Sequence, residues 1–318
     1  MTRDISELLE ELRPTAFAIA YRMLGTVSEA EDVVQEALLR VHAALERGEE
    51  LASARAYVST VTTRLAIDEL RSARVRRERY VGEWLPEPIV TDAGSDPARE
   101  AEMADSLSLA MLLVLERLTP EQRAVLLLRD VFDYEYREIA SIVGKSDAGV
   151  RQLASRARRL VAEQRPRFQT SREQQDELTR RFFAAARDGD LAGLEALLAD
   201  DVVLTGDGGG KVPALARSLR GRSRVARTLR NWVKLGSRVP GASMTPVELG
   251  GSPGALLLDP QGRVLGAWVL ELGDGYVQRI FSIVNPEKLA HLGGVGDLAG
   301  MLRAAGSASD GARPHPRR

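Results

Sequence analysis

The chain has 318 residues, which is enough for two or three domains that each bury a core. Hydrophobic residues make up 44% and charged residues 28%, so the composition excludes a wholly disordered protein. Cysteine is absent, which excludes disulfides and thiolate metal sites and fits a reducing, cytoplasmic location. We expect no membrane span, no metal and no cofactor, because there is no long apolar run and the three histidines lie far apart.

Residues 4–79 predict a helical domain, because apolar residues recur at three- and four-residue spacing and no proline follows Pro14. Ser28 and Glu31 have the spacing of a capping box, which predicts a helix from Ser28 to about Leu45. The expected buried stripe of this helix consists of Val33, Ala37, Val41 and Leu45. The opposite face is polar and carries Asp32, Gln35 and Glu36.

A second long helix is expected from about Arg55 to Tyr80. Its end is a cluster of arginines, namely Arg71, Arg74, Arg76, Arg77 and Arg79. Cations suit a helix C-terminus, so a solvated helix end is one interpretation of this cluster. Five arginines exceed what a helix end needs, and we therefore prefer phosphate binding.

Residues 81–103 interrupt the helical pattern with prolines, glycines and an acidic bias. Because each proline disfavours helix at the residue before it, this segment predicts a partly extended linker. Its acidity, at Glu83 and Glu87 among others, suits a basic channel better than DNA. Helical signal resumes near Glu102 and continues to about Gln164.

Residues 119–160 have the pattern of a helix-turn-helix. Thr119 before Pro120 predicts the start of one helix. Gly144 then predicts a sharp turn after a short helix, and Ser146 predicts the N-cap of the next one.

The second of these helices separates an apolar stripe from a polar, basic surface. The stripe is expected at Val150, Leu153, Ala157 and Leu160, and the other faces carry Arg151, Gln152, Ser155, Arg156, Arg158 and Arg159. Arginine can bind guanine with two donors, glutamine can read adenine, and serine or arginine can hold phosphates. An ordinary amphipathic helix is the alternative for this helix alone. The glycine turn and the absence of nearby acids after Asp147 favour DNA recognition.

Residues 171–291 predict an α+β domain. Two short helices, at about 173–188 and 190–199, precede β-branched and aromatic segments with glycine-containing turns at Asp259–Gly262 and Gly273–Gly275. We expect helices packed on a curved antiparallel sheet, with Trp232 and Trp268 in its core or lining its cavity. Residues 292–318, rich in glycine, alanine, proline and arginine, predict a disordered tail.

The sequence SEAEDVVQEALLRVH at residues 28–42 resembles region 2 of extracytoplasmic-function sigma factors, where this helix binds the clamp helices of the RNA polymerase β′ subunit. The helix that follows, ARAYVSTVTTRLAIDELRSARVRRE, resembles the one that contacts the −10 promoter element, and residues 118–160 resemble region 4, which reads the −35 element. YVGEWLPEPI, DGGGK at 207–211 and NPEKL at 285–289 resemble a subgroup, the sigma factor J type, in which a SnoaL-like domain follows the sigma regions.

The resemblance implies two all-α sigma domains followed by a cone-shaped α+β domain of the kind shared with polyketide cyclases. Region 2 would occupy residues 1–80, the linker 81–103, region 4 residues 104–166 and the SnoaL-like domain 171–291. The implied partners are core RNA polymerase, through the β′ clamp helices and the β flap, and promoter DNA.

The resemblance also implies roles for single residues. Asp32, Gln35 and Glu36 would bind polymerase. The six polar residues of the second helix of the helix-turn-helix would read the −35 element. The residues that would contact the −10 element are Arg55, Tyr57, Arg64, Arg71, Arg74, Arg76 and Arg77. Tyr57 has a core role as its alternative. The family usually has an Arg-Asn pair where this chain has Thr63 and Arg64, and the 47–54 loop has no aromatic residue, so the −10 preference stays open.

The linker is long enough for both promoter elements. From Tyr80 to Glu102 it could reach about 75 Å when fully extended. Two turns of DNA span roughly 70 Å, so the two DNA-binding domains can sit on elements that far apart.

For the last domain the resemblance implies regulation of the sigma regions in cis, in place of a separate anti-sigma protein. The residues concerned are Asp207, Gly208, Gly209, Gly210 and Lys211, with Asn285, Pro286, Glu287, Lys288 and Leu289. Asp207 could pair with Lys211 at the mouth of the cone, or the glycines could simply allow close backbone packing. NPEKL is expected to dock on the sigma regions, and whether a small ligand fills the cone is left open.

Two other functions stay as alternatives. A one-component regulator would bind DNA alone and sense a ligand, but it would have no use for the polymerase-binding helix. An enzyme of the cyclase or isomerase type would use Asp207 as general base. No histidine lies between Glu173 and Ala290, so we expect no catalytic residues and no enzyme activity.

Overall fold

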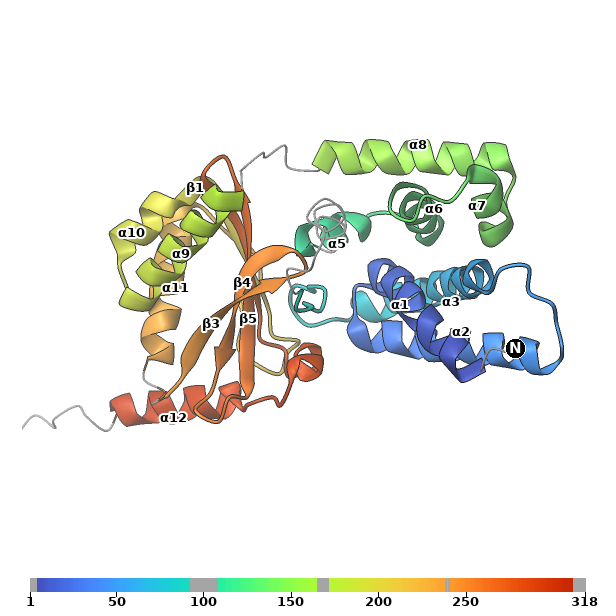
Figure 1. Cartoon of the computed structure of the whole chain (residues 1–318). Helices are drawn as coiled ribbons and strands as arrows, with labels where there is room; N and C mark the ends of the chain where they lie inside the picture. The colour runs from blue at the N-terminus through green and yellow to red at the C-terminus, as the bar shows by residue number, and fades with distance from the viewer. Residues whose placement is uncertain (1–4, 92–107, 165–171, 238, 240, 311–318) are drawn as a thin grey trace, which may run out of the picture. The chain divides into compact units, whose positions relative to one another are not determined.

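The computed structural model describes residues 5–91, 108–164, 172–237, 239 and 241–310 (Figure 1). The described residues fall into two units. Residues 5–79 and 108–164 form the first unit, which is helical. Residues 80–91 and those from 172 onward form the second unit, which is built on a β-sheet.

Three long helices pack against one another in the first part of unit 1, namely α1 (Ile5–Leu24), α2 (Val27–Glu46) and α3 (Ala54–Arg77). The buried face of α2 includes Val33, Ala37 and Val41 as expected, with Ala30, Val34 and Ala44 beside them. The expected start of α2 is wrong by two residues. Thr26 is its N-cap and its hydroxyl donates to Glu29 at 2.7 Å, because Thr26 and Glu29 repeat the spacing of Ser28 and Glu31.

The described residues 108–164 of unit 1 contain four helices, α5 (Leu109–Leu115), α6 (Pro120–Asp130), α7 (Tyr136–Val143) and α8 (Asp147–Gln164). The predicted helix ends are confirmed. Thr119 and Gln122 form a reciprocal capping box, Gly144 has φ 66°, and the Ser146 hydroxyl accepts from the Gly149 amide at 3.2 Å. The glycine conformation lets α7 end and α8 begin at a sharp turn.

The helix-turn-helix has its own small core, which consists of Val125, Leu128, Ile139, Ala140, Ile142, Val150 and Ala154. Of the stripe expected on α8, Val150 and Ala157 are buried, whereas Leu153 and Leu160 are only half-buried. Ala154 lies in the core at the position where the sequence pattern placed Leu153, because its small side chain lets the helices approach closely.

A buried charge cluster joins the two parts of unit 1. Arg123 is 1% exposed and donates to Glu116 at 2.6 Å and to the Arg22 carbonyl at 3.1 Å. Arg77 also pairs with Glu116 and donates to the Leu24 carbonyl at 2.7 Å. Burial alone would raise the pKa of Glu116, but the charges of Arg123 and Arg77 outweigh it and hold that pKa below its usual value.

The described part of unit 2 contains a six-stranded sheet in the order β2-β1-β6-β5-β4-β3. The strands are β1 (Leu198–Asp207), β2 (Leu219–Arg220), β3 (Ser243–Leu249), β4 (Ser252–Leu258), β5 (Val264–Gly273) and β6 (Tyr276–Ile283). Register shifts near Val203, Leu258 and Leu272 curve the sheet. The expected antiparallel pairing holds except between β1 and β6, which are parallel because a helix and three long strands separate them along the chain.

Helices α9 (Arg172–Asp188), α10 (Leu191–Leu197) and α11 (Arg222–Gly236) cover one face of this sheet (Figure 1). Trp268 lies in the core between them, and Trp232 packs on it with ring centroids 6.3 Å apart. Helix α11 was not among the expected elements, because its many arginines obscure the apolar stripe of Val225, Ala226 and Leu229.

Two predicted segments differ in the structure. Within residues 292–318, Leu298–Asp310 form the helix α12, although residues 311–318 lie outside the described residues. The first part of the linker, residues 80–91, belongs to unit 2, and Val90 forms a β-bridge with Leu249. This part is extended, as predicted, because it pairs with the edge of the sheet. No helix in the described ranges is long and apolar enough to cross a membrane.

We predict that Glu116→Gln lowers the free energy of unfolding of unit 1 by about 3 kcal/mol, because it leaves Arg123 buried without a counter-charge. A lowered pKa means that the carboxylate contributes stability above pH 4.5, its ordinary pKa, and loses it as the pH falls further. The free energy of unfolding of wild type, measured with denaturant, should therefore fall below that pH. In the variant, the part of this fall that comes from Glu116 should be absent.

The matched control is Glu36→Gln, which breaks the exposed Glu36–Arg40 pair and should cost less than about 1 kcal/mol. Equal losses in the two variants would contradict the structural role given to Glu116.

Candidate nucleic-acid interfaces and the linker-binding site

The polar surface of α8 presents the six side chains that the sequence predicts for base and phosphate contact. All six, Arg151, Gln152, Ser155, Arg156, Arg158 and Arg159, are exposed. They fall into two groups, because among the described residues only two of them make hydrogen bonds or ion pairs with neighbouring side chains of unit 1.

Two of these arginines are fixed by neighbours. Arg151 donates to Asp147 at 3.0 Å and lies over the Tyr136 ring at 4.6 Å. Arg158 pairs with Asp130 and donates to the Tyr136 hydroxyl at 3.2 Å, and the hydrogen bond to Asp130 is the main cause of its raised pKa. Such contacts orient a guanidinium before it meets a ligand.

The other four polar residues of α8 make no side-chain hydrogen bond or ion pair within the described ranges. They are Gln152, Ser155, Arg156 and Arg159. An exposed helical face with two arginines, a glutamine and a serine offers donors for both base edges and phosphates.

The arginines of α3 are less available than the sequence suggests. Arg64 donates to the carbonyls of Ser141 and Ile142, both at 2.9 Å, at the end of α7. Arg71 bonds Glu121 at 2.6 Å, and Arg76 bonds Glu29 at 2.6 Å. In this arrangement these arginines of the −10 set bind other parts of unit 1.

The strength of these contacts differs. Arg71 and Arg76 are more than half exposed, and exposed ion pairs contribute less than about 1 kcal/mol, so a phosphate could replace their carboxylates. Arg77 is only 17% exposed and belongs to the Glu116 cluster, which is structural. Arg55 is exposed and Tyr57 is half-buried. The side chain of Arg74 lies outside the described residues.

The polar face of α2 contains one residue that the sequence analysis missed. Asp32, Gln35 and Glu36 are exposed on this face, and Leu39 lies beside them with 54% of its surface exposed. Positions 32, 35, 36 and 39 share one side of a helix. Leu39 adds apolar surface to this polar face, and its place outside the apolar stripe was the signal available in the sequence.

A buried carboxylate holds the linker in unit 2. Asp207, at the end of β1, is fully buried and accepts from the Tyr80 hydroxyl at 2.5 Å, the Leu85 amide at 2.9 Å and the Gly209 amide at 3.1 Å. Lys288 donates at 2.7 Å to Oδ2 of this carboxylate, the oxygen that also accepts from the Leu85 amide. Burial first, and then the hydrogen bond to Asp207, raise the pKa of Tyr80, which therefore stays a donor.

Lys288 completes this linker-binding site. It is 5% exposed, donates to the Leu85 carbonyl, and lies 4.8 Å from the Tyr80 ring centroid and 4.4 Å from that of Trp84. Cation–π contacts with two aromatic rings partly replace the water that a buried ammonium loses. The expected pairing of Asp207 with Lys211 is wrong. Lys211 pairs with Glu287 at the surface, because the turn after β1 carries it away from the carboxylate.

The glycines of DGGGK allow the NPEKL segment to approach this site. A Cβ at Gly209, where φ is +58°, would lie 2.3 Å from Asn285 Nδ2, and one at Gly208 would lie 2.1 Å from the Val212 carbonyl oxygen. Asn285 donates to the Tyr80 hydroxyl at 2.9 Å. Close packing therefore explains the glycines, and both motifs meet the linker inside unit 2.

Further contacts hold the rest of the linker. The Ser218 amide donates to Glu83 at 3.2 Å, His291 lies 2.6 Å from the Pro88 carbonyl, and the Thr91 amide donates to the Glu248 carbonyl at 3.1 Å. Leu85 is 1% exposed. The linker thus fills a site on unit 2, and its acidic Glu83 is bound there.

The geometry does not favour catalysis at Asp207. Its carboxylate already accepts from the linker and from Lys288, so it has no free position for a substrate proton. Burial raises the pKa of Glu271 on β5, with Arg279 at 3.5 Å partly opposing it. One such carboxyl without a histidine or a nucleophile beside it does not make an active site. The described residues contain no group of acids and histidines that could hold a metal ion.

The two helical parts of unit 1 match known protein families. Residues 8–76 match the family model of Sigma-70 region 2, and residues 108–161 match that of Sigma-70 region 4. The chain is 38% identical over 293 residues to the ECF RNA polymerase sigma factor SigJ of Mycobacterium tuberculosis, which covers 90% of this chain and 93% of SigJ. It is 32% identical over 283 residues to the probable ECF sigma factor SigI of that species, covering 87% and 93%.

The fold agrees as well. The crystal structure of M. tuberculosis SigJ matches with a TM-score of 0.70 at 34% identity, over 90% of this chain and 98% of SigJ. Both sigma regions and the α+β unit fall within that match. The chain therefore belongs to the extracytoplasmic function (ECF) sigma factors of RNA polymerase, in the type that carries a SnoaL-like domain after region 4.

Proposed function

We propose that α8 reads the −35 element, that α3 contacts the −10 element, that the exposed face of α2 binds the β′ clamp helices, and that unit 2 regulates these activities in cis. The membership of the ECF family makes the chain a transcription initiation factor. The observation that carries the regulatory part is the binding of residues 80–91 by Asp207 and Lys288.

The exposed residues of α8 support its role at the −35 element. Gln152, Ser155 and Arg156 stand on one polar face next to the oriented Arg151. A side chain that makes two hydrogen bonds to one base contributes about 1–3 kcal/mol of discrimination. The −35 set of the sequence analysis is therefore kept, with Arg158 expected to position the helix through Asp130 and Tyr136.

Binding of both promoter elements requires unit 1 to open. Arg64 binds the end of α7 at 2.9 Å, which holds α3 against the helix-turn-helix. Two turns of DNA separate the elements by roughly 70 Å, a span that this contact does not allow. We therefore expect polymerase or promoter binding to release Arg64 and Arg71 from α7 and α6, after which both can face DNA.

The linker-binding site supports regulation in cis. Residues 80–91 connect α3 to the remainder of the linker, and unit 2 binds them through backbone and side-chain contacts. A linker that is partly bound spans a shorter distance than a free one. Unit 2 would thus limit how far the two sigma regions separate, and release of the linker would permit it.

The polymerase contact is tested by Asp32→Arg combined with Glu36→Arg. We predict that this variant binds core RNA polymerase about 10- to 100-fold more weakly, because two exposed carboxylates become cations on the proposed contact face. The dissociation constant can be measured by fluorescence anisotropy of the labelled full-length chain.

The control is Glu7→Arg with Glu10→Arg, which makes the same change in charge at exposed positions of α1. If the α2 variant and this control both bind like wild type, the assignment of α2 to polymerase fails.

The regulatory claim is tested by Tyr80→Phe, which removes the hydroxyl that donates to Asp207 and accepts from Asn285. We expect the linker to dissociate from unit 2 more often, because buried Asp207 and Asn285 each lose a partner. Hydrogen exchange at the Leu85 amide should become faster, and promoter-specific transcription with core polymerase should change by at least about threefold.

Tyr276→Phe serves as the control. Tyr276 is an exposed tyrosine of the same unit, and it pairs with Gly273 at the start of β6, whereas Asn285 follows the end of that strand. Faster exchange at Leu85 without any change in transcription would show that the linker site does not regulate the chain.

A further inference from the structure

One segment of unit 2 that the proposed function does not use is strongly basic. Residues 211–247 contain nine lysines and arginines and no aspartate or glutamate, although the whole chain has a formal net charge of −1. Helix α11 carries five of these cations, Arg222, Arg224, Arg227, Arg230 and Lys234. Such segregation produces a local positive potential in a protein that is nearly neutral overall.

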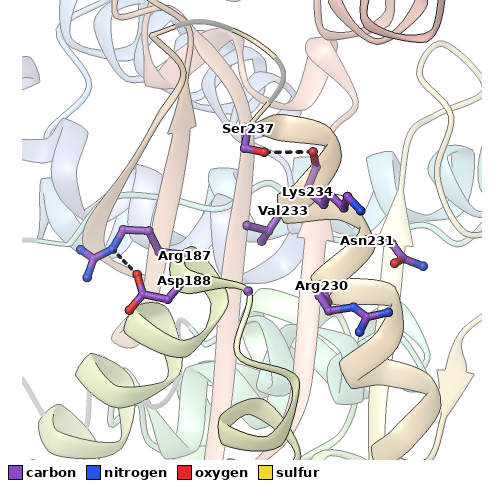
Figure 2. A pocket seen from close by; sticks show the side chains of 8 residues that line it. Arg187, Asp188, Arg230, Asn231, Val233, Lys234 and Ser237 are labelled. Carbon is purple, nitrogen blue, oxygen red and sulfur yellow. Dashed lines mark hydrogen bonds and ion pairs between the residues drawn. The ribbon is translucent and has the colours of Figure 1, made fainter. Parts of the chain in front are cut away.

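The cations of α11 lie on its outer side. Val225, Ala226 and Leu229 are fully buried against the core of unit 2, whereas Arg224, Arg227 and Lys234 are exposed and Arg230 is half-buried. From Arg224 to Lys234 the helix rises about 15 Å. Figure 2 shows Arg230 and Lys234 projecting from successive turns of α11 beside an exposed amide, that of Asn231.

Three cations in or next to this segment have carboxylate partners and do not count as available. Lys211 pairs with Glu287, Arg222 pairs with Asp200 at 3.0 Å, and Arg187 of α9 pairs with Asp188 at 3.3 Å. Arg227 donates to its own helix, at the Ser223 carbonyl. Within the described ranges Arg224, Arg227, Arg230 and Lys234 have no carboxylate partner, so their charge is uncompensated.

A shallow hollow adjoins this helix. It is lined by Arg187, Asp188 and Gly189 at the end of α9 and by Arg230, Asn231, Val233, Lys234 and Ser237 (Figure 2). Arg230, Lys234 and the Asn231 amide can donate to phosphate oxygens there.

We propose that the outer face of α11 binds the DNA backbone, as a further contact of this chain with the promoter duplex outside the −10 and −35 elements. This inference rests on the proposed promoter function. Duplex DNA carries one phosphate charge per roughly 1.7 Å of its axis, so a cation row of about 15 Å faces several phosphates.

The composition of the face favours DNA over an acidic protein. Protein interfaces have apolar and aromatic centres, whereas interfaces with DNA are polar and strongly positive. Among the described residues, the exposed large hydrophobic side chains are Leu39, Val81, Val90 and Tyr276, and none belongs to α11. Seven residues separate Gln164 of α8 from Arg172 of α9, so a promoter-bound α8 gives unit 2 a high effective concentration near DNA.

The test uses the full-length chain and duplex DNA without promoter elements, with affinities measured by fluorescence anisotropy between 50 and 200 mM NaCl. The variant Arg224→Gln/Arg227→Gln/Lys234→Gln removes three exposed charges. We expect the slope of log affinity against log salt to become shallower by about 2–3, at roughly 0.9 per phosphate contact, with affinity at low salt reduced about tenfold or more.

The control Arg172→Gln/Arg180→Gln/Arg181→Gln removes three exposed charges from α9 and should leave the slope unchanged. If the α11 variant behaves like this control, the proposal is overturned. It is also overturned if the variant keeps its DNA affinity and slope but binds core polymerase more weakly, since α11 would then contact protein.

Failure of the proposed promoter function gives a different result. With core polymerase present, Arg156→Ala on α8 should lower the preference for promoter over non-promoter DNA, whereas the α11 variant should weaken binding to both DNAs equally. If Arg156→Ala leaves that preference unchanged while the α11 variant still lowers the slope, the −35 assignment fails and the α11 contact stands.

Discussion

The ion pair of Asp207 and Lys288 is the interaction on which the binding of the linker by unit 2 depends. Both residues are almost fully buried, and burial of two charges costs several kcal/mol for each unless their hydrogen bonds are satisfied. Here the linker supplies the missing partners, through the Leu85 amide and carbonyl, the Tyr80 hydroxyl and two aromatic rings. An empty site would leave these charges poorly compensated, so unit 2 favours the bound linker. The proposed regulation in cis rests on this preference.

In unit 1, too, charged side chains are bound by another segment of the chain, but through weaker and more exposed contacts. Arg64 and Arg71 of α3 bind carbonyls and a carboxylate of the helix-turn-helix, and both contacts are exposed enough for phosphate to compete. The Glu116 cluster beside them is buried and resists such exchange. If these arginines bind DNA as proposed, weak internal contacts let the chain exist in closed and open forms that differ by only a few kcal/mol, and binding of polymerase or promoter can shift that balance.

Much of this structure follows from local sequence patterns. Thr119, Gly144 and Ser146 predicted the helix-turn-helix boundaries, because capping and left-handed turns depend on adjacent residues. The partner of Asp207 was mistaken, since Lys288 is 81 residues away and sequence proximity favoured Lys211. The sequence predicted a partly extended linker but not the site that binds it, because that site is assembled from segments distant in sequence. Helix α11 went unrecognised for another reason, which is that its arginines mask a narrow apolar stripe.

Run-off transcription with core RNA polymerase on a promoter library, using the full-length chain and a chain truncated after about residue 170, tests the central claim most directly. The account predicts promoter-specific transcripts only when polymerase and the chain are both present, with a strength that differs between the two forms. Promoter footprints by the chain without polymerase, combined with no gain in transcripts, would contradict the sigma-factor account. Identical transcription by both forms would contradict regulation by unit 2.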